Sequence, residues 1–168
     1  MASSPRISVP NWEHQLTTLL PLYGHRNWIV VADSAYPAQS KPGIETVVSG
    51  SGQLEVTRKV LDAVNATRHV RANVYLDQEL AFVAEADAPG VTHYRTQLAE
   101  MLKGANKIPM PHEQIIAKLD QISQAFRVLI IKTDLTIPYT SAFFELGCAY
   151  WPADSEARMR KAMTAAGK

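Results

Sequence analysis

The fold is decided by one stretch, YGHRNWIVVADSAYP, which runs from Tyr23 to Pro37. Its centre, residues 28–32, is a short apolar run bounded by turn residues, and this pattern predicts a strand that is buried on both faces. His25 lies just before that strand and Asp33 just after it. Because ligands of open α/β sheets bind outside the carboxyl ends of the strands, the stretch is also a candidate place for chemistry.

The composition is that of one globular domain. The chain has 168 residues, and its 46% of apolar residues is enough to fill one core. Seventeen Lys and Arg nearly balance sixteen Asp and Glu, which gives no electrostatic footprint for nucleic acid or a membrane surface. The chain shows neither a secretory signal nor the ~20 apolar residues of a membrane span. We therefore expect one cytoplasmic domain over residues 1–168, with no nucleic-acid or membrane partner.

Strand and helix patterns alternate along the chain. Residues 1–10 predict an irregular arm, residues 77–90 are ambiguous, and residues 151–168 predict a terminal helix or a frayed tail. The expected helices span about 11–20, 53–65, 92–103 and 111–124, and the expected strands span about 28–32, 44–49, 69–76, 127–132 and 141–150. This alternation predicts a three-layer α/β/α domain with a largely parallel central sheet.

The sequence gives little support for a metal, a disulfide or a bound phosphate. Cys148 is the single cysteine and lies in an apolar run, so we expect a buried, inert thiol. The five histidines show no ligand spacing, and no metal is expected. The turn Gly50-Ser51-Gly52 lacks both phosphate-binding glycine patterns, so an ordinary strand–helix turn is the simpler interpretation and phosphate binding the alternative.

Two other places carry polar groups suited to a site. His112 would lie in the first turn of a helix, where the dipole disfavours the imidazolium and a neutral ring could exchange a proton near pH 7. The segment from Ile130 to Glu145, IIKTDLTIPYTSAFFE, joins two strands. Its Tyr139 and Ser141 either belong to a plain, half-buried connection or offer hydroxyls to a polyhydroxylated ligand, and spacing alone leaves both open.

Three blocks of the chain, in order, resemble the ribose pyranase/fucose mutarotase family of sugar-transport-associated proteins. The first block is the GH turn, the apolar strand and ADSAYPA, in which eight positions separate His25 from Asp33. The tripeptide Pro-His-Glu at 111–113 is similar to the segment that opens a late helix in the family. KTDLTIPYTSAFFELG, at 132–147, is similar to the family's closing block. The likeness covers about residues 14–150.

The resemblance implies small α/β subunits in closed homo-oligomeric rings, with the sugar site at a subunit interface. It also implies an isomerase that opens and recloses the hemiacetal ring of a free monosaccharide, ribose-like or fucose-like, without a metal or an organic cofactor. His25 and Asp33 would be the catalytic residues. His112, Tyr139 and Ser141 would bind the substrate.

The chain departs from the family's pattern at several positions. Ser141 stands where the family has Asn, and Leu135 stands where it has Glu. Asn27 replaces an Asp that often follows the GH pair, and Ile116 replaces an expected Lys. These departures keep a second hypothesis open, a non-catalytic sugar-binding or regulatory oligomer with the same fold.

Overall fold

The structure, a computed structural model, describes residues 11–167 of the chain. The irregular arm expected over residues 1–10 lies outside this range. Six strands form one sheet in the order β2-β5-β1-β6-β3-β4. The strands are β1 (Trp28–Ala32), β2 (Ile44–Val48), β3 (Val70–Asp77), β4 (Asn106–Met110), β5 (Val128–Lys132) and β6 (Ala142–Cys148). The helices are α1 (Trp12–Leu19), α2 (Gln53–Asn65), α3 (Val91–Met101), α4 (His112–Ile122) and α5 (Ala153–Ala166), with a short 3₁₀ helix, η1 (Gln78–Phe82), after β3.

The sheet is largely parallel, as predicted. β1, β2 and β5 pair in parallel, and so do β3 and β4. β6 runs antiparallel between β1 and β3. A parallel crossover takes a dozen or more residues, and the nine residues 133–141 that join β5 to β6 are too few. The parallel strands therefore all end at one end of the sheet, called the carboxyl end below, where β6 begins. The opposite end is the amino end.

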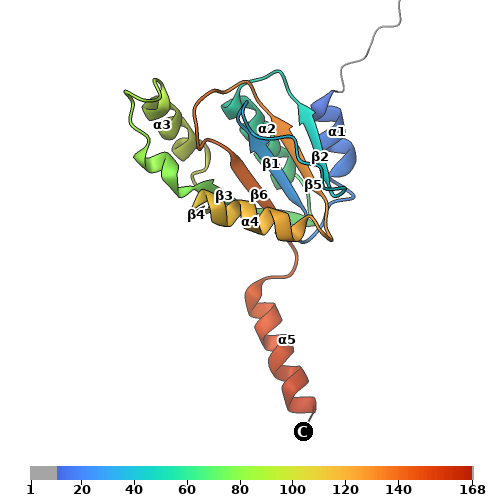
Figure 1. The fold of residues 1–168 in the computed structure, drawn as a ribbon. Coiled ribbons are helices and arrows are strands. Elements are labelled where there is room, and N and C mark those ends of the chain that lie inside the picture. The colour runs from blue at the N-terminus through green and yellow to red at the C-terminus, as the bar shows by residue number, and fades with distance from the viewer. Residues whose placement is uncertain (1–10, 168) are drawn as a thin grey trace, which may run out of the picture.

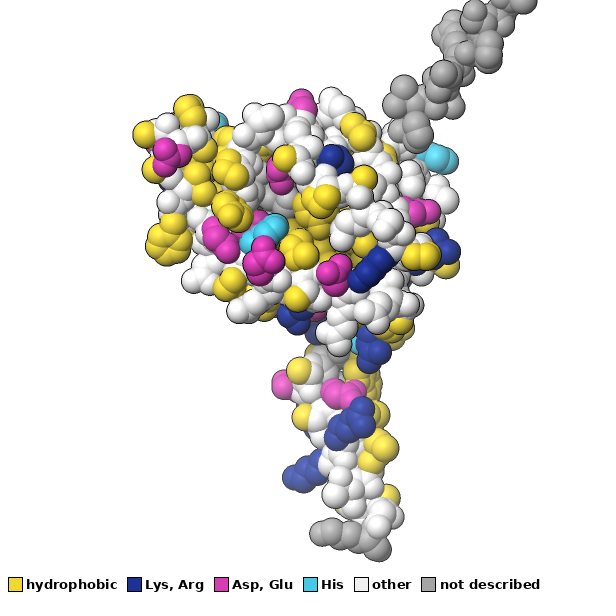
Figure 2. Space-filling model, in the orientation of Figure 1, with side chains coloured by type: hydrophobic (Ala, Val, Ile, Leu, Met, Phe, Trp, Pro, Cys, Tyr) yellow, Lys and Arg dark blue, Asp and Glu magenta, His cyan; other side chains and the backbone are white. Residues whose placement is uncertain are grey.

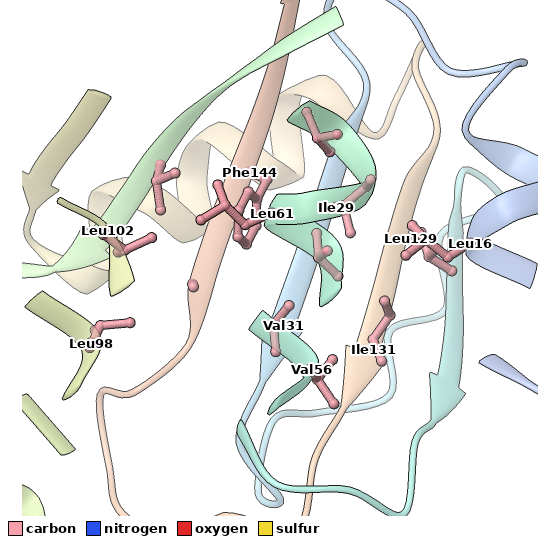
Figure 3. Packing of buried hydrophobic residues seen from close by; sticks show 14 of the residues in the cluster. Leu16, Ile29, Val31, Val56, Leu61, Leu98, Leu102, Leu129, Ile131 and Phe144 are labelled. Atoms are coloured by element: carbon pink, nitrogen blue, oxygen red, sulfur yellow. The ribbon is translucent and has the colours of Figure 1, made fainter. Parts of the chain in front are cut away.

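Strand β1 is buried on both faces, and its side chains on each face pack into a separate hydrophobic core. Ile29 and Val31 pack into a cluster with α1, α2 and α3, while Trp28 and Val30 pack on the other face with α4. Figure 3 shows Ile29 and Val31 pointing toward α2 beside the matching side chains of β5. Burying each such aliphatic side chain stabilises the fold by about 1.5–3 kcal/mol. The helices thus lie on both faces of the sheet, which confirms the three-layer α/β/α prediction (Figure 1).

The predicted elements are present, and one strand was missed. β4 has an exposed Lys107 and a Pro109, residues that disfavour a central strand but are tolerated at the edge of a sheet, where β4 lies. The ambiguous residues after β3 begin with η1. Residues 153–166 are helical, and α5 projects away from the sheet with none of its described residues buried (Figure 1). Within residues 11–167, no helix combines the length and apolarity needed to cross a bilayer.

Candidate active site

The carboxyl end of the sheet brings together polar residues that are far apart in the sequence. Asp33 follows β1, Asp77 ends β3, His112 opens α4 directly after β4, and Ser141 immediately precedes β6. These strands are neighbours, so the side chains that follow them meet. A cavity of about 370 Å³ lies at this place. Its walls include Asp33, Tyr36, Asp77, His112, Glu113, Ile116 and Tyr139.

Asp33 and Ser141 form the first half of the site. The Ser141 hydroxyl donates a hydrogen bond to Asp33 Oδ1 at 3.0 Å, and Ser141 is almost fully buried. The backbone N–H of Asp33 points back at the same hydroxyl at 3.4 Å. Ser141 therefore fixes the orientation of the carboxylate, while Asp33 remains partly exposed to the cavity.

A buried polar network holds the segment that carries Tyr139 and Ser141. The side-chain amide of Gln53 donates to the carbonyls of Val31 and Thr140, each at 2.9 Å. The hydroxyl of Tyr94 also donates to the Thr140 carbonyl, at 2.8 Å, and burial raises the pKa of Tyr94. The Thr133 hydroxyl donates to the Gln53 side chain at 2.6 Å. Because these groups are buried and paired, they lock the loop between β5 and β6 to α2 and α3.

His112 and Asp77 form the second half of the site. The His112 Nδ1 atom lies 2.9 Å from Asp77 Oδ1. The backbone N–H of His112 donates to both carboxylate oxygens of Glu79, at 3.0 and 3.1 Å, so an acid caps the start of α4. The His112 side chain is 29% exposed and the Asp77 side chain only 1%. The ring is therefore held from behind by a buried carboxylate while part of it reaches the cavity.

The carboxyl of Asp77 is in an unusual environment. Burial raises its pKa above the ordinary value, with a smaller contribution from the charges of Glu79 and Asp33. The hydrogen bond from His112 acts in the opposite direction. The second oxygen, Oδ2, is buried and has no hydrogen-bond partner among residues 11–167. The bond to His112 is thus the main compensation for a costly buried acid.

Tyr139 completes the rim of the cavity. Its backbone is in the left-handed region, with a φ of 58°, which is uncommon for a residue with a side chain. Tyr139 is 41% exposed, and its ring meets the His112 ring edge-on, with 5.7 Å between the ring centres. The charged walls of the cavity are acidic, and no Lys or Arg of the described chain lines it. Figure 2 shows a histidine among acidic side chains on the face turned to the viewer.

His25 lies at the opposite end of the sheet from the other predicted site residues. It precedes β1, whereas Asp33 follows it, and five strand residues at ~3.3 Å each put the two ends about 16 Å apart. A single chain therefore does not bring His25 and Asp33 together, and the carboxylate that meets a histidine ring within the chain is Asp77. Of the five predicted site residues, four lie at the carboxyl end.

His25 lines a second, larger cavity at the amino end. This cavity has a volume of about 690 Å³, and its walls include His25, Arg26, Arg71, Glu145 and Trp151. His25 and Arg26 are exposed, and Arg26 has a φ of 77°, a strained backbone that holds the turn before β1. Glu145 accepts hydrogen bonds from Asn73 at 3.1 Å and Tyr75 at 3.4 Å.

Asp77 and Glu79 are two residues of this region that the sequence motifs do not mark. Both fall at the start of the segment left ambiguous, where no helical or alternating period is present. One signal was available, because Asp77, like Asp33, stands at the carboxyl end of a predicted strand. No group of three or more potential metal ligands is found within residues 11–167.

Comparison with solved structures gives the same fold. Bacillus subtilis RbsD complexed with D-ribose superposes with a TM-score of 0.55 at 16% identity, covering 88% of this chain and 98% of that one. The fucose mutarotase of Streptococcus pneumoniae in complex with L-fucose gives 0.55 at 18% identity, covering 84% and 97%. FucU from Bifidobacterium longum gives 0.54 at 18% identity, covering 80% and 94%.

Comparison of sequences identifies the family. No match is found among curated protein sequences. Residues 10–149 match the RbsD / FucU transport protein family, and this range holds both halves of the site, His25 and the six strands of the described part of the chain. The match ends before α5. The chain therefore belongs to the RbsD / FucU transport protein family.

Proposed function

We propose that this protein is a mutarotase-like isomerase that interconverts the anomers or ring forms of a free monosaccharide. The observation that carries the proposal is the convergence of Asp33, His112 and Tyr139 on one cavity, with Ser141 hydrogen-bonded to Asp33, in a member of this family. Two structures with the same fold hold D-ribose and L-fucose. The resemblance of the motifs at these same residues points to the same class of ligand.

The chemistry suits the residues. Opening a hemiacetal ring needs a base to take the anomeric hydroxyl proton and an acid to protonate the ring oxygen. Carboxylates, an imidazole and hydroxyls also hydrogen-bond a neutral polyol. We expect Asp33, held by Ser141, and Tyr139 to bind sugar hydroxyls, and no cofactor is required for these proton transfers.

We further propose that the complete site forms between two copies of the chain in a homo-oligomeric ring. His25, called catalytic from its motif, is exposed at the amino end, while Asp33 faces the cavity at the carboxyl end. The amino end of one copy, docked on the carboxyl end of the next, would bring the two residues together. Such head-to-tail contacts close into rings when the rotation between copies permits.

The charge of the cavity favours an uncharged sugar over a phosphorylated one. Its charged walls are Asp33, Asp77 and Glu113, with His112 as the one basic group among the described residues. A phosphate would meet like charges on these walls, and the part of the cavity supplied by the described residues of one chain offers it no Lys or Arg to pair with. The alternative phosphate site, Gly50 to Gly52, is not part of these walls.

Saturation-transfer NMR between the anomer signals of ribose, fucose, galactose and glucose tests the proposal. Exchange faster than in buffer is expected for at least one sugar, with loss of that acceleration in Asp33→Asn. His14→Gln, on the exposed side of α1, is the control and should exchange like the wild type. Folded protein that accelerates none of these sugars would refute the enzymatic proposal.

A second candidate function is supported by the departures at the site. Ile116 is apolar where the family has Lys, and the Ser141 hydroxyl is already bonded to Asp33. A non-catalytic sugar-binding oligomer would bind a monosaccharide in a calorimeter without accelerating its exchange. Binding that survives His25→Ala, with no exchange in the wild type, would favour this candidate.

A further inference from the structure

We propose that Asp77 positions His112 as the base that takes the anomeric hydroxyl proton, a role for His112 that goes beyond binding the sugar. The proposal rests on the proposed function for its catalytic part, while the hydrogen bond between Asp77 and His112 is a property of the folded chain alone. The motifs of the sequence do not mark Asp77, and for His112 they imply only substrate binding, although its place at a helix start lets a neutral ring exchange a proton.

The contact fixes which nitrogen of the ring is free. An ionised carboxylate only accepts hydrogen bonds, so His112 Nδ1 carries the proton that it shares with Asp77 Oδ1 across 2.9 Å. The other nitrogen, Nε2, then has an open lone pair in the neutral ring. No hydrogen bond to Nε2 is found within residues 11–167, and the ring lines the cavity. A basic nitrogen is therefore presented where a sugar hydroxyl would lie.

Three restraints hold this arrangement. Glu79 anchors the backbone N–H of His112, Asp77 anchors the ring, and Tyr139 packs against the ring edge. Asp77 has no second partner for its buried carboxylate among the described residues, so its charge acts mainly on this imidazole. A buried carboxylate behind a histidine stabilises the imidazolium that forms when the ring accepts a proton.

The proton transfers balance without any further reactant. His112 Nε2 takes the proton of the anomeric hydroxyl, and the electron pair of that O–H bond forms the carbonyl. The bond from the anomeric carbon to the ring oxygen breaks, and its electron pair stays on the ring oxygen. That oxygen takes a proton from a separate acidic group, for which His25 of a neighbouring copy is the candidate. Reclosure returns both protons and can deliver either anomer.

The tautomer of His112 tests the contact directly. Long-range ¹H–¹⁵N NMR distinguishes the two neutral forms of an imidazole, and the His112 signals are assigned by their loss in His112→Gln. In the neutral ring, the wild type is expected to hold the proton on Nδ1. A ring protonated on Nε2 would overturn the proposal whether or not the protein turns over any sugar.

Asp77→Asn tests the consequence for catalysis, with Asp62→Asn as the matched control at an exposed position of α2. The Nδ1–H population is expected to fall in Asp77→Asn, because the amide carries no charge and can donate to Nδ1. Anomer exchange should fall about ten- to a hundredfold while the affinity for the sugar stays within about twofold. Asp62→Asn should change neither. In a protein active on a sugar, exchange by Asp77→Asn equal to that of Asp62→Asn would overturn the positioning role.

Discussion

The two ends of the sheet carry different kinds of polar groups. At the carboxyl end, Asp33, Asp77 and His112 are each held by a partner from another element of the same chain. At the amino end, His25 and Arg26 are exposed on a strained turn. One end is a preorganised half-site, and the other presents side chains outward. The difference supports a site completed between copies, because neither end alone holds all the proposed groups.

The largest expected effect is the recovery of activity in a mixture of two inactive variants. His25→Ala and Asp33→Ala each remove one end of the proposed shared site, and each should abolish exchange alone. If the two variants are co-expressed in equal amounts and assemble at random, about a quarter of the interfaces keep both His25 and Asp33 intact. Sugar exchange by NMR should recover to about that fraction of wild type.

The control for this mixture uses two variants of the same end. A mixture of Asp33→Ala chains and His112→Gln chains has no interface with an intact carboxyl end, so no recovery of sugar exchange is expected. Recovery in this pair, or none in the first pair despite mixed assembly shown by native mass spectrometry, would contradict a site shared between the two ends.

A smaller effect is expected from Ser141→Ala, which removes the donor to Asp33 without touching His112. A hydrogen bond to a charged group is worth about 1.5–3 kcal/mol, so sugar exchange should fall at least about tenfold. Ser155→Ala on the exposed α5 is the matched control and should leave the NMR exchange rate unchanged. Equal rates in both variants would mean that the orientation of Asp33 is set by something other than Ser141.

Stability should respond to Asp77→Asn in the opposite direction to activity. Since burial raises the pKa of Asp77, the group favours the fold below its ordinary pKa of 3.8, and that contribution is lost as the pH rises through the raised value. At neutral pH the variant, which has no charge to desolvate, should be more stable by about 1 kcal/mol in urea unfolding. The difference should vanish in acid. A less stable variant at neutral pH would show that the pair with His112 outweighs the burial of Asp77.

The smallest effect concerns α5, which leaves from the amino end. A chain that stops at Pro152 loses no buried residue of the described structure. Its free energy of unfolding as a single chain should change by less than about 0.5 kcal/mol. Denaturant unfolding at low protein concentration measures this. A loss of several kcal/mol would assign α5 a packing partner.

Most of the fold could be predicted because its signals are local. The apolar run of β1, the helical period of α2 and the turn residues between them are readable within a few positions. β4 was not predicted, because a strand that contains Lys and Pro forms only through its pairing with β3. Of the polar residues gathered at the carboxyl end, Asp33, His112, Tyr139 and Ser141 were named from motifs, whereas Asp77 was not.

By itself the sequence determined the order of the strands and helices other than β4, the two-sided burial of β1 and the likeness of three motifs to one family. It also determined which polar residues follow or precede strands. The tertiary structure alone decided which of them meet. Strand order and direction put Asp33, Asp77 and His112 at one end of the sheet and His25 at the other. Spacing along the chain does not reveal this, because strand pairing is set by contacts between distant residues.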